Sequence, residues 1–332
     1  MEERKKDHID LALNSQTLPE SLDKRFNYEP MLSAHPSGDD EPFEFLGKTQ
    51  KVPLWVSSMT GGTKMAGTIN RNLARACNEF GMGMGLGSCR IIMEDETHFE
   101  DFNMRPIIGD EYPFYANLGI AQIEMFLAEK QTGRIEELLG KLRADGLVIH
   151  VNPIQEWCQP EGDNLLKPPI ETISELLALV EYPVIVKEVG QGMGPESLKA
   201  LLKLPLEAIE FAAYGGTNFA LVELMRADDQ VRKFYEPASQ VGHDAVEMTE
   251  TINRLIDTEK ETRCRQLIIS GGIKSFLDGY YLIKKSKLPA IYGQASSFLQ
   301  YARGDYKILR EFVSHQVSGL RLAEAYLTLK ED

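Results

Sequence analysis

Residues 146–152 read GLVIHVN, a short apolar run that ends at His150 and Asn152. A strand with one solvent-exposed face alternates apolar and polar residues, whereas a strand covered on both faces is apolar throughout. The run is also shorter than a typical helix. It therefore predicts a buried strand of a parallel sheet that helices cover.

Similar runs recur along the chain from about residue 53. The eight runs are residues 53–59, 81–87, 113–119, 146–152, 183–190, 206–213, 266–272 and 289–295. Segments with helical spacing separate most of them, as in residues 65–80, where Ile69, Leu73 and Ala76 form one stripe. Eight such units predict a closed (α/β)8 TIM barrel. An open doubly wound sheet is the alternative, but the first unit lacks a G-x-G-x-x-G fingerprint.

The domain organisation follows from two irregular spacers. Residues 1–52 are interpreted as an N-terminal lead-in, of which 17–52 cover one barrel end, and residues 53–332 as the barrel; together they form a single domain. Residues 226–263 are long and charged, and we expect them to form the sixth connection with a helix in 243–258. Long loops in compact domains are often lids.

Composition excludes several classes of protein. The 332 residues are 43% hydrophobic and 26% charged, as in soluble globular proteins. The formal net charge of −14 disfavours nucleic acid and anionic membranes as partners. No apolar stretch approaches the ~20 residues of a membrane span, and the N-terminus lacks a signal peptide's apolar core. The four cysteines form no CxxC pair, which is typical of reduced thiols. These features favour a cytoplasmic protein.

The chemistry of a barrel enzyme lies where its strands end. Three of the predicted ends are small and glycine-rich: residues 215–217, 270–272 and 293–295. A single Gly-Gly pair is most often a turn, but several at one barrel end favour phosphate binding by backbone N–H groups. Lys187 closes an otherwise apolar strand, so we expect its ammonium to point towards a phosphate or an electron-rich ring.

The strand ends carry a specific set of motifs. They are RKKDHI (4–9), MTGGT (59–63), GLGSCR (85–90), ANLG (116–119), HVNPIQEWCQPEGD (150–163), VKEVGQG (186–192), YGGTNFALVELMR (214–226) and SGGI (270–273). In this order they resemble the type 2, flavin-dependent isopentenyl diphosphate isomerases. HxNxxQE followed by QPEGD is the most specific part of the resemblance, whereas MTGGT and SGGI are shared with other FMN barrels.

The resemblance implies an FMN-binding barrel that shifts a proton between isopentenyl and dimethylallyl diphosphate. It further implies Mg²⁺ and NADPH as reductant of the flavin. The implied FMN-binding residues are Met59, Thr60, Gly61, Ser88, Asn117, Lys187, Thr217, Gly271, Gly272, Ala295 and Ser296. The implied substrate-binding residues are Arg4, Lys5, Ser88, Arg90, Asn152 and Gln155, and the implied catalytic residues are Gln155, His150 and His8. Glu156 would hold the metal.

The pair Gln155 and Glu156 has a physical interpretation within this resemblance. A carboxylate together with substrate oxygens suits a hard cation on a diphosphate. Gln155 does not ionise in the useful range, so it can orient a reacting group but is a poor acid or base. A flavin that exchanges protons would remove the need for an ordinary acid–base pair.

Departures from the family pattern concern the substrate more than the flavin. Lys274 stands where the family has arginine, Cys89 where glutamine is common, and residues 241–248 differ throughout. Two other functions stay open: an FMN-dependent hydroxy-acid oxidase or dehydrogenase, and a non-catalytic FMN-binding homologue. A closed homo-oligomer is the expected assembly.

Overall fold

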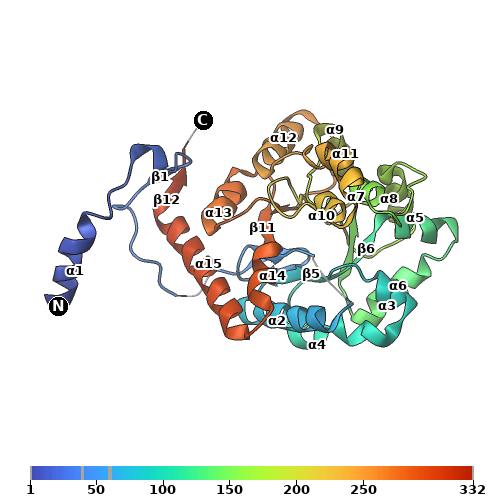
Figure 1. The fold of residues 1–332 in the computed structure, drawn as a ribbon, viewed down its shortest axis with the longest axis horizontal. Coiled ribbons are helices and arrows are strands. Elements are labelled where there is room, and N and C mark those ends of the chain that lie inside the picture. Colours follow the sequence, from blue (N-terminus) through green and yellow to red (C-terminus); the bar gives the residue numbers. More distant parts are fainter. Residues whose placement is uncertain (1, 39–40, 59–61, 331–332) are drawn as a thin grey trace.

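Eight parallel strands close into a barrel in this computed structural model, which describes residues 2–38, 41–58 and 62–330 (Figure 1). The barrel strands are β4 (Leu54–Val56), β5 (Gly83–Gly85), β6 (Phe114–Gly119), β7 (Gly146–His150), β8 (Val184–Lys187), β9 (Ala208–Glu210), β10 (Leu267–Ser270) and β11 (Ala290–Gln294). Each pairs with the next along the chain, and β11 closes the ring onto β4. The predicted barrel is thereby confirmed.

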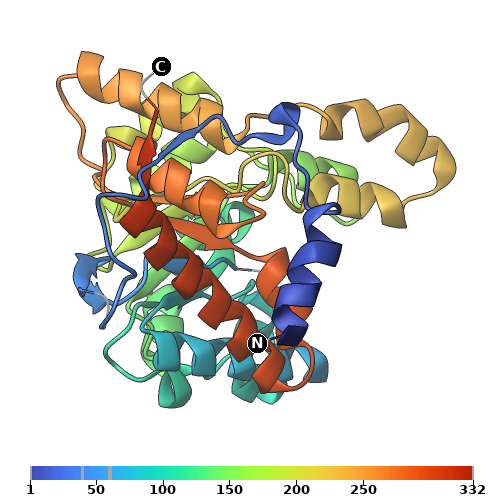
Figure 2. The same ribbon diagram turned by 90° about the vertical axis from the view of Figure 1, so that its left-hand side faces the viewer.

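Except for α1, the helices surround the barrel or connect its strands (Figures 1 and 2). Those before residue 160 are α1 (Glu2–Ala12), α2 (Lys64–Phe80), α3 (Arg90–Glu94), α4 (Arg105–Ile108), α5 (Ile120–Ala128), α6 (Gly133–Leu142) and α7 (Pro153–Cys158). Those after it are α8 (Pro169–Leu177), α9 (Pro195–Leu202), α10 (Phe219–Arg226), α11 (Asp229–Ser239), α12 (Ala245–Thr258), α13 (Phe276–Lys285), α14 (Ser296–Ala302) and α15 (Tyr306–Tyr326). Two 3-10 turns lie at Pro19–Ser21 and Glu96–Asp101.

Helix α2 illustrates how local sequence sets an element. The Thr63 side chain accepts a hydrogen bond from the amide of Ala66 and caps the first turn. Gly81 ends the helix in the left-handed conformation at φ 74°. The predicted apolar stripe, which includes Ile69 and Leu73, is buried against the barrel.

Two elements differ from the sequence-based expectation. The run 206–213 forms a strand only over Ala208–Glu210, because Ala212 adopts a positive φ of 43° that breaks the extended backbone. In the connection 226–263 the expected helix in 243–258 is present as α12, but α11 precedes it. Asp228 caps α11 through the amides of Gln230 and Val231, a signal that the high charge of this segment obscured.

A hairpin fills the end of the barrel at which the strands begin. Strands β2 (Phe43–Phe45) and β3 (Lys48–Gln50) pair antiparallel. At the hairpin, Phe45 and Leu46 are buried against inward-facing residues of the barrel, among them Trp55 and Tyr115. This end is therefore a packed core, and a ligand site belongs at the opposite end, which we call the mouth.

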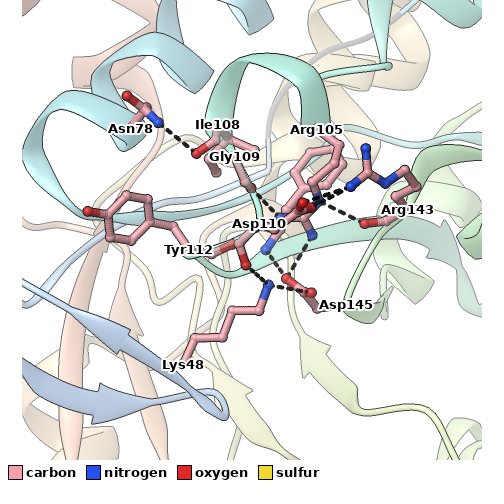
Figure 3. A network of polar contacts seen from close by, with 10 residues as sticks. Lys48, Asn78, Arg105, Ile108, Gly109, Asp110, Tyr112, Arg143 and Asp145 are labelled. Carbon is pink, nitrogen blue, oxygen red and sulfur yellow. Dashed lines mark hydrogen bonds and ion pairs between the residues drawn. The ribbon is translucent and has the colours of Figure 1, made fainter.

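A polar network fixes the hairpin to the barrel (Figure 3). The guanidinium of Arg105, whose side chain is 1% exposed, pairs with Asp145 at 2.8 Å. The other oxygen of Asp145 contacts the ammonium of Lys48, from the hairpin, at 2.6 Å. Asp145 also accepts the amide of Phe114 at 2.8 Å. One buried guanidinium and one carboxylate thus join the hairpin to the starts of β6 and β7.

Two short strands, one following the N-terminal segment and one near the C-terminus, pair beside α15. Strand β1 (Phe26–Tyr28) pairs antiparallel with β12 (Leu327–Leu329). Helix α1 precedes this small sheet and stands apart from the barrel, beyond α15 (Figure 1). Within the described ranges, none of the helices has the length and apolar character needed to cross a membrane.

Candidate functional site

A cavity of about 420 Å³ opens at the mouth, between the ends of β4, β8, β9, β10 and β11. Its volume falls in the range of small-molecule sites, roughly 300–1,000 Å³. Six of the residues predicted to bind FMN line it: Lys187, Thr217, Gly271, Gly272, Ala295 and Ser296. The residues predicted from separate strand ends are therefore brought together.

Gly271 shapes the cavity wall because its backbone has no room for a side chain. Its φ is +90°, and a Cβ there would lie 2.1 Å from the carbonyl oxygen of Ala213. Gly272 follows with φ +72°. These two glycines therefore let the chain after β10 pack tightly against the backbone of Ala213 and Tyr214 along this side of the cavity.

The start of α14 offers amide groups to the same cavity. Ala295 precedes the helix and provides no side-chain cap. The first N–H groups of a helix lack intrahelical acceptors, and they carry the positive end of the helix dipole. The cavity also contains Lys274, which is exposed at its rim. Together with Gly271 and Gly272, this arrangement suits a phosphate group.

Four buried polar side chains in the cavity have atoms without a hydrogen-bond partner among the described residues. They are Ser57, Ser58, Glu210 and Gln294. Gln294 lies in the predicted phosphate-binding end 293–295, but Ser57, Ser58 and Glu210 were not predicted, although the small polar pair Ser57 and Ser58 at the end of an apolar run was a usable signal. Unpartnered buried polar atoms are rare in folded proteins, so they indicate contacts that a ligand or water completes.

Lys187 connects the cavity to the HxNxxQE segment. Its ammonium donates to the backbone carbonyl of Glu188 at 2.8 Å, while the Glu188 carboxylate accepts backbone amides. His150 lies opposite Lys187 on the adjacent strand β7. Burial lowers the pKa of His150 well below that of free imidazole, and the Lys187 ammonium adds to this effect. The ring is therefore neutral at neutral pH.

Asn117 fixes the orientation of that ring. Nδ1 of His150 lies 2.7 Å from Oδ1 of Asn117. A carbonyl oxygen only accepts, so Nδ1 carries the proton and Nε2 keeps its lone pair. Nε2 faces Gly119, where a Cβ would lie 2.9 Å away. The neutral imidazole can therefore accept a hydrogen bond but offers no positive charge.

The short helix α7 presents Gln155 and Glu156 in fixed positions. The amide of Asn152 donates to Gln155 Oε1 at 3.2 Å and to Glu156 Oε1 at 2.8 Å. The second oxygen of Glu156 accepts the backbone amide of Asp163 at 2.9 Å. Pro153 begins the helix, and the chain returns through residues 159–163 to close this contact. The QPEGD tail thus holds the Glu156 carboxylate.

Glu223 on α10 completes the cluster and was not predicted. Gln155 Nε2 donates to Glu223 Oε1 at 3.3 Å. The Glu223 side chain is 7% exposed and also contacts Arg226 at 3.1 Å. In sequence, Glu223 sits in FALVELMR, where a charged residue is typical of a solvated helix face.

Several predicted residues lie elsewhere. Arg90 is exposed and contacts Asp163 at 3.0 Å, while Ser88 is exposed at the loop before α3. Arg4, Lys5 and His8 are exposed on α1, which Figure 1 shows away from the mouth. The structure therefore does not bring the N-terminal basic residues to Gln155.

Three predicted FMN contacts, Met59, Thr60 and Gly61, lie outside the described residues. Among the described residues, no group of three or more His, Cys, Asp or Glu side chains is arranged to hold a metal ion. Mg²⁺ usually takes one or two protein carboxylates and completes its shell with water and phosphate oxygens. Glu156 fits that pattern as a single protein ligand.

Comparison with known proteins identifies the family. No model of a protein family matches the chain. The isopentenyl-diphosphate delta-isomerase of Rickettsia felis is 31% identical over 324 residues, which cover 96% of this chain and 91% of that protein. The chain belongs to the isopentenyl-diphosphate delta-isomerase family. The enzyme of the same name from Rickettsia typhi is 32% identical over 90% of this chain and 86% of its own length.

Solved structures share the fold of this isomerase family member. A mutant flavocytochrome b2 with pyruvate bound aligns with a TM-score of 0.63 and 13% identity, over 91% of this chain and 72% of that one. A mandelate oxidase variant with a monooxide FMN adduct aligns with a TM-score of 0.58 and 14% identity, over 99% of both chains. The barrel is consistent with the type 2, flavin-dependent branch of the family.

Proposed function

We propose that the protein interconverts isopentenyl and dimethylallyl diphosphate by a 1,3-proton shift, with reduced FMN in the mouth cavity and Mg²⁺ at Glu156. NADPH is the proposed reductant. The observation that carries the proposal is the position of Gln155 and Glu156, which Asn152 holds together one strand away from the Lys187 end of the cavity. The activity for which the related enzymes are named supports the same proposal.

The residues of the cavity fit FMN. Backbone amides near Gly271 and the start of α14 suit its phosphate, and Lys187 suits the electron-rich ring at the other side. Ser57 Oγ, Ser58 Oγ and Gln294 Oε1, which have no hydrogen-bond partner among the described residues, supply polar contacts between them. Reduced flavin, when bound, supplies a group that can give and take protons without net oxidation of the substrate.

Gln155 and Glu223 are positioned to orient the reacting end of the substrate and to hold a proton beside it. Asn152 holds the oxygen of the Gln155 amide, so its NH₂ group points to Glu223. A carboxylate within hydrogen-bond distance of this amide can hold a proton at its oxygen while the amide orients the alkene. The neutral His150 ring adds no positive charge of its own to that of the neighbouring Lys187 ammonium.

Glu156 is proposed to bind Mg²⁺ together with the diphosphate. Its two oxygens already accept hydrogen bonds from Asn152 and from the Asp163 amide, which fixes the carboxylate for a cation. Arg90 lies next to this segment through Asp163 and can contribute positive charge to the diphosphate. A protein with a formal net charge of −14 needs such local positive charges to bind an anion.

Isotope exchange and reductant consumption together test the reaction. In D₂O, we expect the product to gain deuterium at the carbons that flank the migrating double bond. NADPH consumption is expected to stop after the enzyme has been primed, because the proton shift has no net redox change. NADPH or oxygen consumption that tracks product one for one would instead establish an FMN oxidoreductase, and flavin binding without turnover a non-catalytic homologue.

Residues 1–52 are proposed as a lead-in to the single barrel domain of 53–332, with α1 packing over the mouth when substrate binds. This requires α1 to leave the position seen in Figure 1. Arg4, Lys5 and His8 would then reach the diphosphate. The proposal rests on a basic cluster in an otherwise acidic chain.

Deleting residues 1–8 is expected to raise KM for isopentenyl diphosphate by about tenfold or more, because charge-assisted hydrogen bonds contribute about 1.5–3 kcal/mol each. FMN affinity should stay within about twofold, since the cavity lies elsewhere. The matched variants are Arg4→Ala with Lys5→Ala, which should reproduce the effect, and Asp7→Asn with Asp10→Asn, which should not. An unchanged KM in the deletion would show that α1 does not contact substrate.

We further propose a cytoplasmic location, since all four cysteines are buried and unpaired with one another. A closed homo-oligomer is the proposed assembly.

A further inference from the structure

Glu210 is a fully buried carboxylate at the end of β9, with a relative exposure of 0%. Oε1 accepts a hydrogen bond from Ser270 Oγ at 3.3 Å, while Oε2 has no hydrogen-bond partner among the described residues. Lys187 lies opposite Glu210 on β8, but within the described ranges no ion pair joins the two. A buried acceptor without a donor destabilises the protein, so this oxygen indicates a contact that a bound molecule completes.

The neighbours of Glu210 form a polar wall across four consecutive strands. Ser270 ends β10, Gln294 ends β11 and Ser57 follows β4. Between them, Gly293 has no side chain, and a Cβ there would lie 2.5 Å from Ser57 Oγ. Ser57 Oγ and Gln294 Oε1 also lack partners among the described residues. Ser57 Oγ therefore packs closely over Gly293, and the wall presents acceptors and hydroxyls to the cavity.

The chemistry of this wall selects one kind of ligand group. A phosphate only accepts hydrogen bonds, so a buried carboxylate would repel it. A hydroxyl both donates and accepts, and it can satisfy a carboxylate oxygen and a serine at once. Strand β9 lies between β8, which carries Lys187, and β10, which leads to Gly271. The wall thus spans the space between the ring end and the phosphate end of the cavity.

We propose that Glu210 recognises the sugar-alcohol chain of the cofactor, with its unpartnered oxygen accepting hydrogen bonds from the chain hydroxyls. Ser57 and Gln294 bind the same chain. This inference rests on the proposed function, because it takes FMN as the ligand. Glu210 is thereby a specificity residue for a polyhydroxylated chain between ring and phosphate.

The proposal is tested with two flavins that differ only in the chain between ring and phosphate. Apoprotein is titrated with FMN and with 5′-phosphopentyl flavin, which has the same ring and phosphate but no chain hydroxyls, and binding is followed by flavin fluorescence. The wild-type protein should bind FMN about 10- to 100-fold more tightly, the value of one or two hydrogen bonds to a charged group. This comparison uses only the wild-type protein, so its result does not depend on whether a variant folds.

Variants then assign the preference to a residue. Glu210→Ala should reduce the FMN preference to within about threefold by weakening FMN and leaving the analogue nearly unchanged. Glu207→Gln is the matched control, because Glu207 lies at the other end of β9, bonded to Gln266 and outside the cavity. Apo Glu210→Gln should melt at no lower a temperature than the wild-type apoprotein, since it removes a buried charge.

Three results would overturn the inference. One is a wild-type protein that binds both flavins equally. Another is a Glu210→Ala variant that weakens both ligands by the same factor. The third is a Glu210→Gln apoprotein that is destabilised while the FMN preference persists, which would make Glu210 a structural residue. A wild-type protein that binds neither flavin contradicts the flavin proposal itself.

Discussion

Gln155→Ala is expected to slow isomerisation by on the order of 100-fold or more, because a misplaced reacting group alone costs about that factor. The structure gives the reason: Asn152 and Glu223 hold the Gln155 amide from both sides. The measurement is kcat for isopentenyl diphosphate with prereduced FMN, together with deuterium incorporation in D₂O. FMN affinity should not change, since Gln155 does not line the cavity.

Gln159→Ala is the matched control for this effect. Gln159 follows the same helix α7 but lies outside the contact between Gln155 and Glu223. Its turnover should remain close to wild type. If the two variants were equally slow, the loss would reflect damage to α7, and if Gln155→Ala kept wild-type turnover, Gln155 would have no role in positioning.

Glu156→Gln is expected to raise the Mg²⁺ concentration that gives half-maximal activity by about 10- to 100-fold or more. Loss of a residue that only supports a metal ligand already costs about this factor in metal affinity, and Glu156 is the proposed ligand itself. The substitution keeps an oxygen for Asn152 but removes the negative charge that a hard cation requires. Activity is measured over a Mg²⁺ titration at fixed substrate. FMN binding should be unaffected.

Glu161→Gln controls for charge in the same segment, because Glu161 is exposed in the QPEGD tail and should leave the Mg²⁺ dependence unchanged. The metal assignment is wrong if Glu156→Gln follows the wild-type Mg²⁺ titration. It is incomplete if Glu161→Gln shifts the curve by the same factor.

The barrel was predictable because its strands are covered on both faces. Such strands are mostly apolar along their length, so runs such as PVIVK can be recognised in the sequence. Closure of the barrel then brings the ends of all the strands to one mouth. The glycine-rich ends near Gly271 and Ala295 were predictable for the same reason. Position within a unit was enough to place them in one cavity.

Glu210 and Glu223 were not predictable by that argument. Glu210 lies inside an apolar run, where alternation alone does not show that a strand carries a buried carboxylate. Glu223 lies on α10, and its contact with Gln155 joins residues 68 positions apart. The position of α1 could not be predicted from the sequence either, because long-range packing places a helix and its own periodicity does not.

The network around Arg105 has a consequence for how the cofactor is loaded. It anchors the closed end of the barrel, whereas the mouth is built from glycine loops. Amides at the starts of β6 and β7 should therefore be among the slowest to exchange with solvent hydrogen, and those of residues 271–272 among the fastest. Because the barrel is anchored at one end and has its cavity at the other, we expect the proposed flavin to leave and re-enter while the rest of the barrel stays folded.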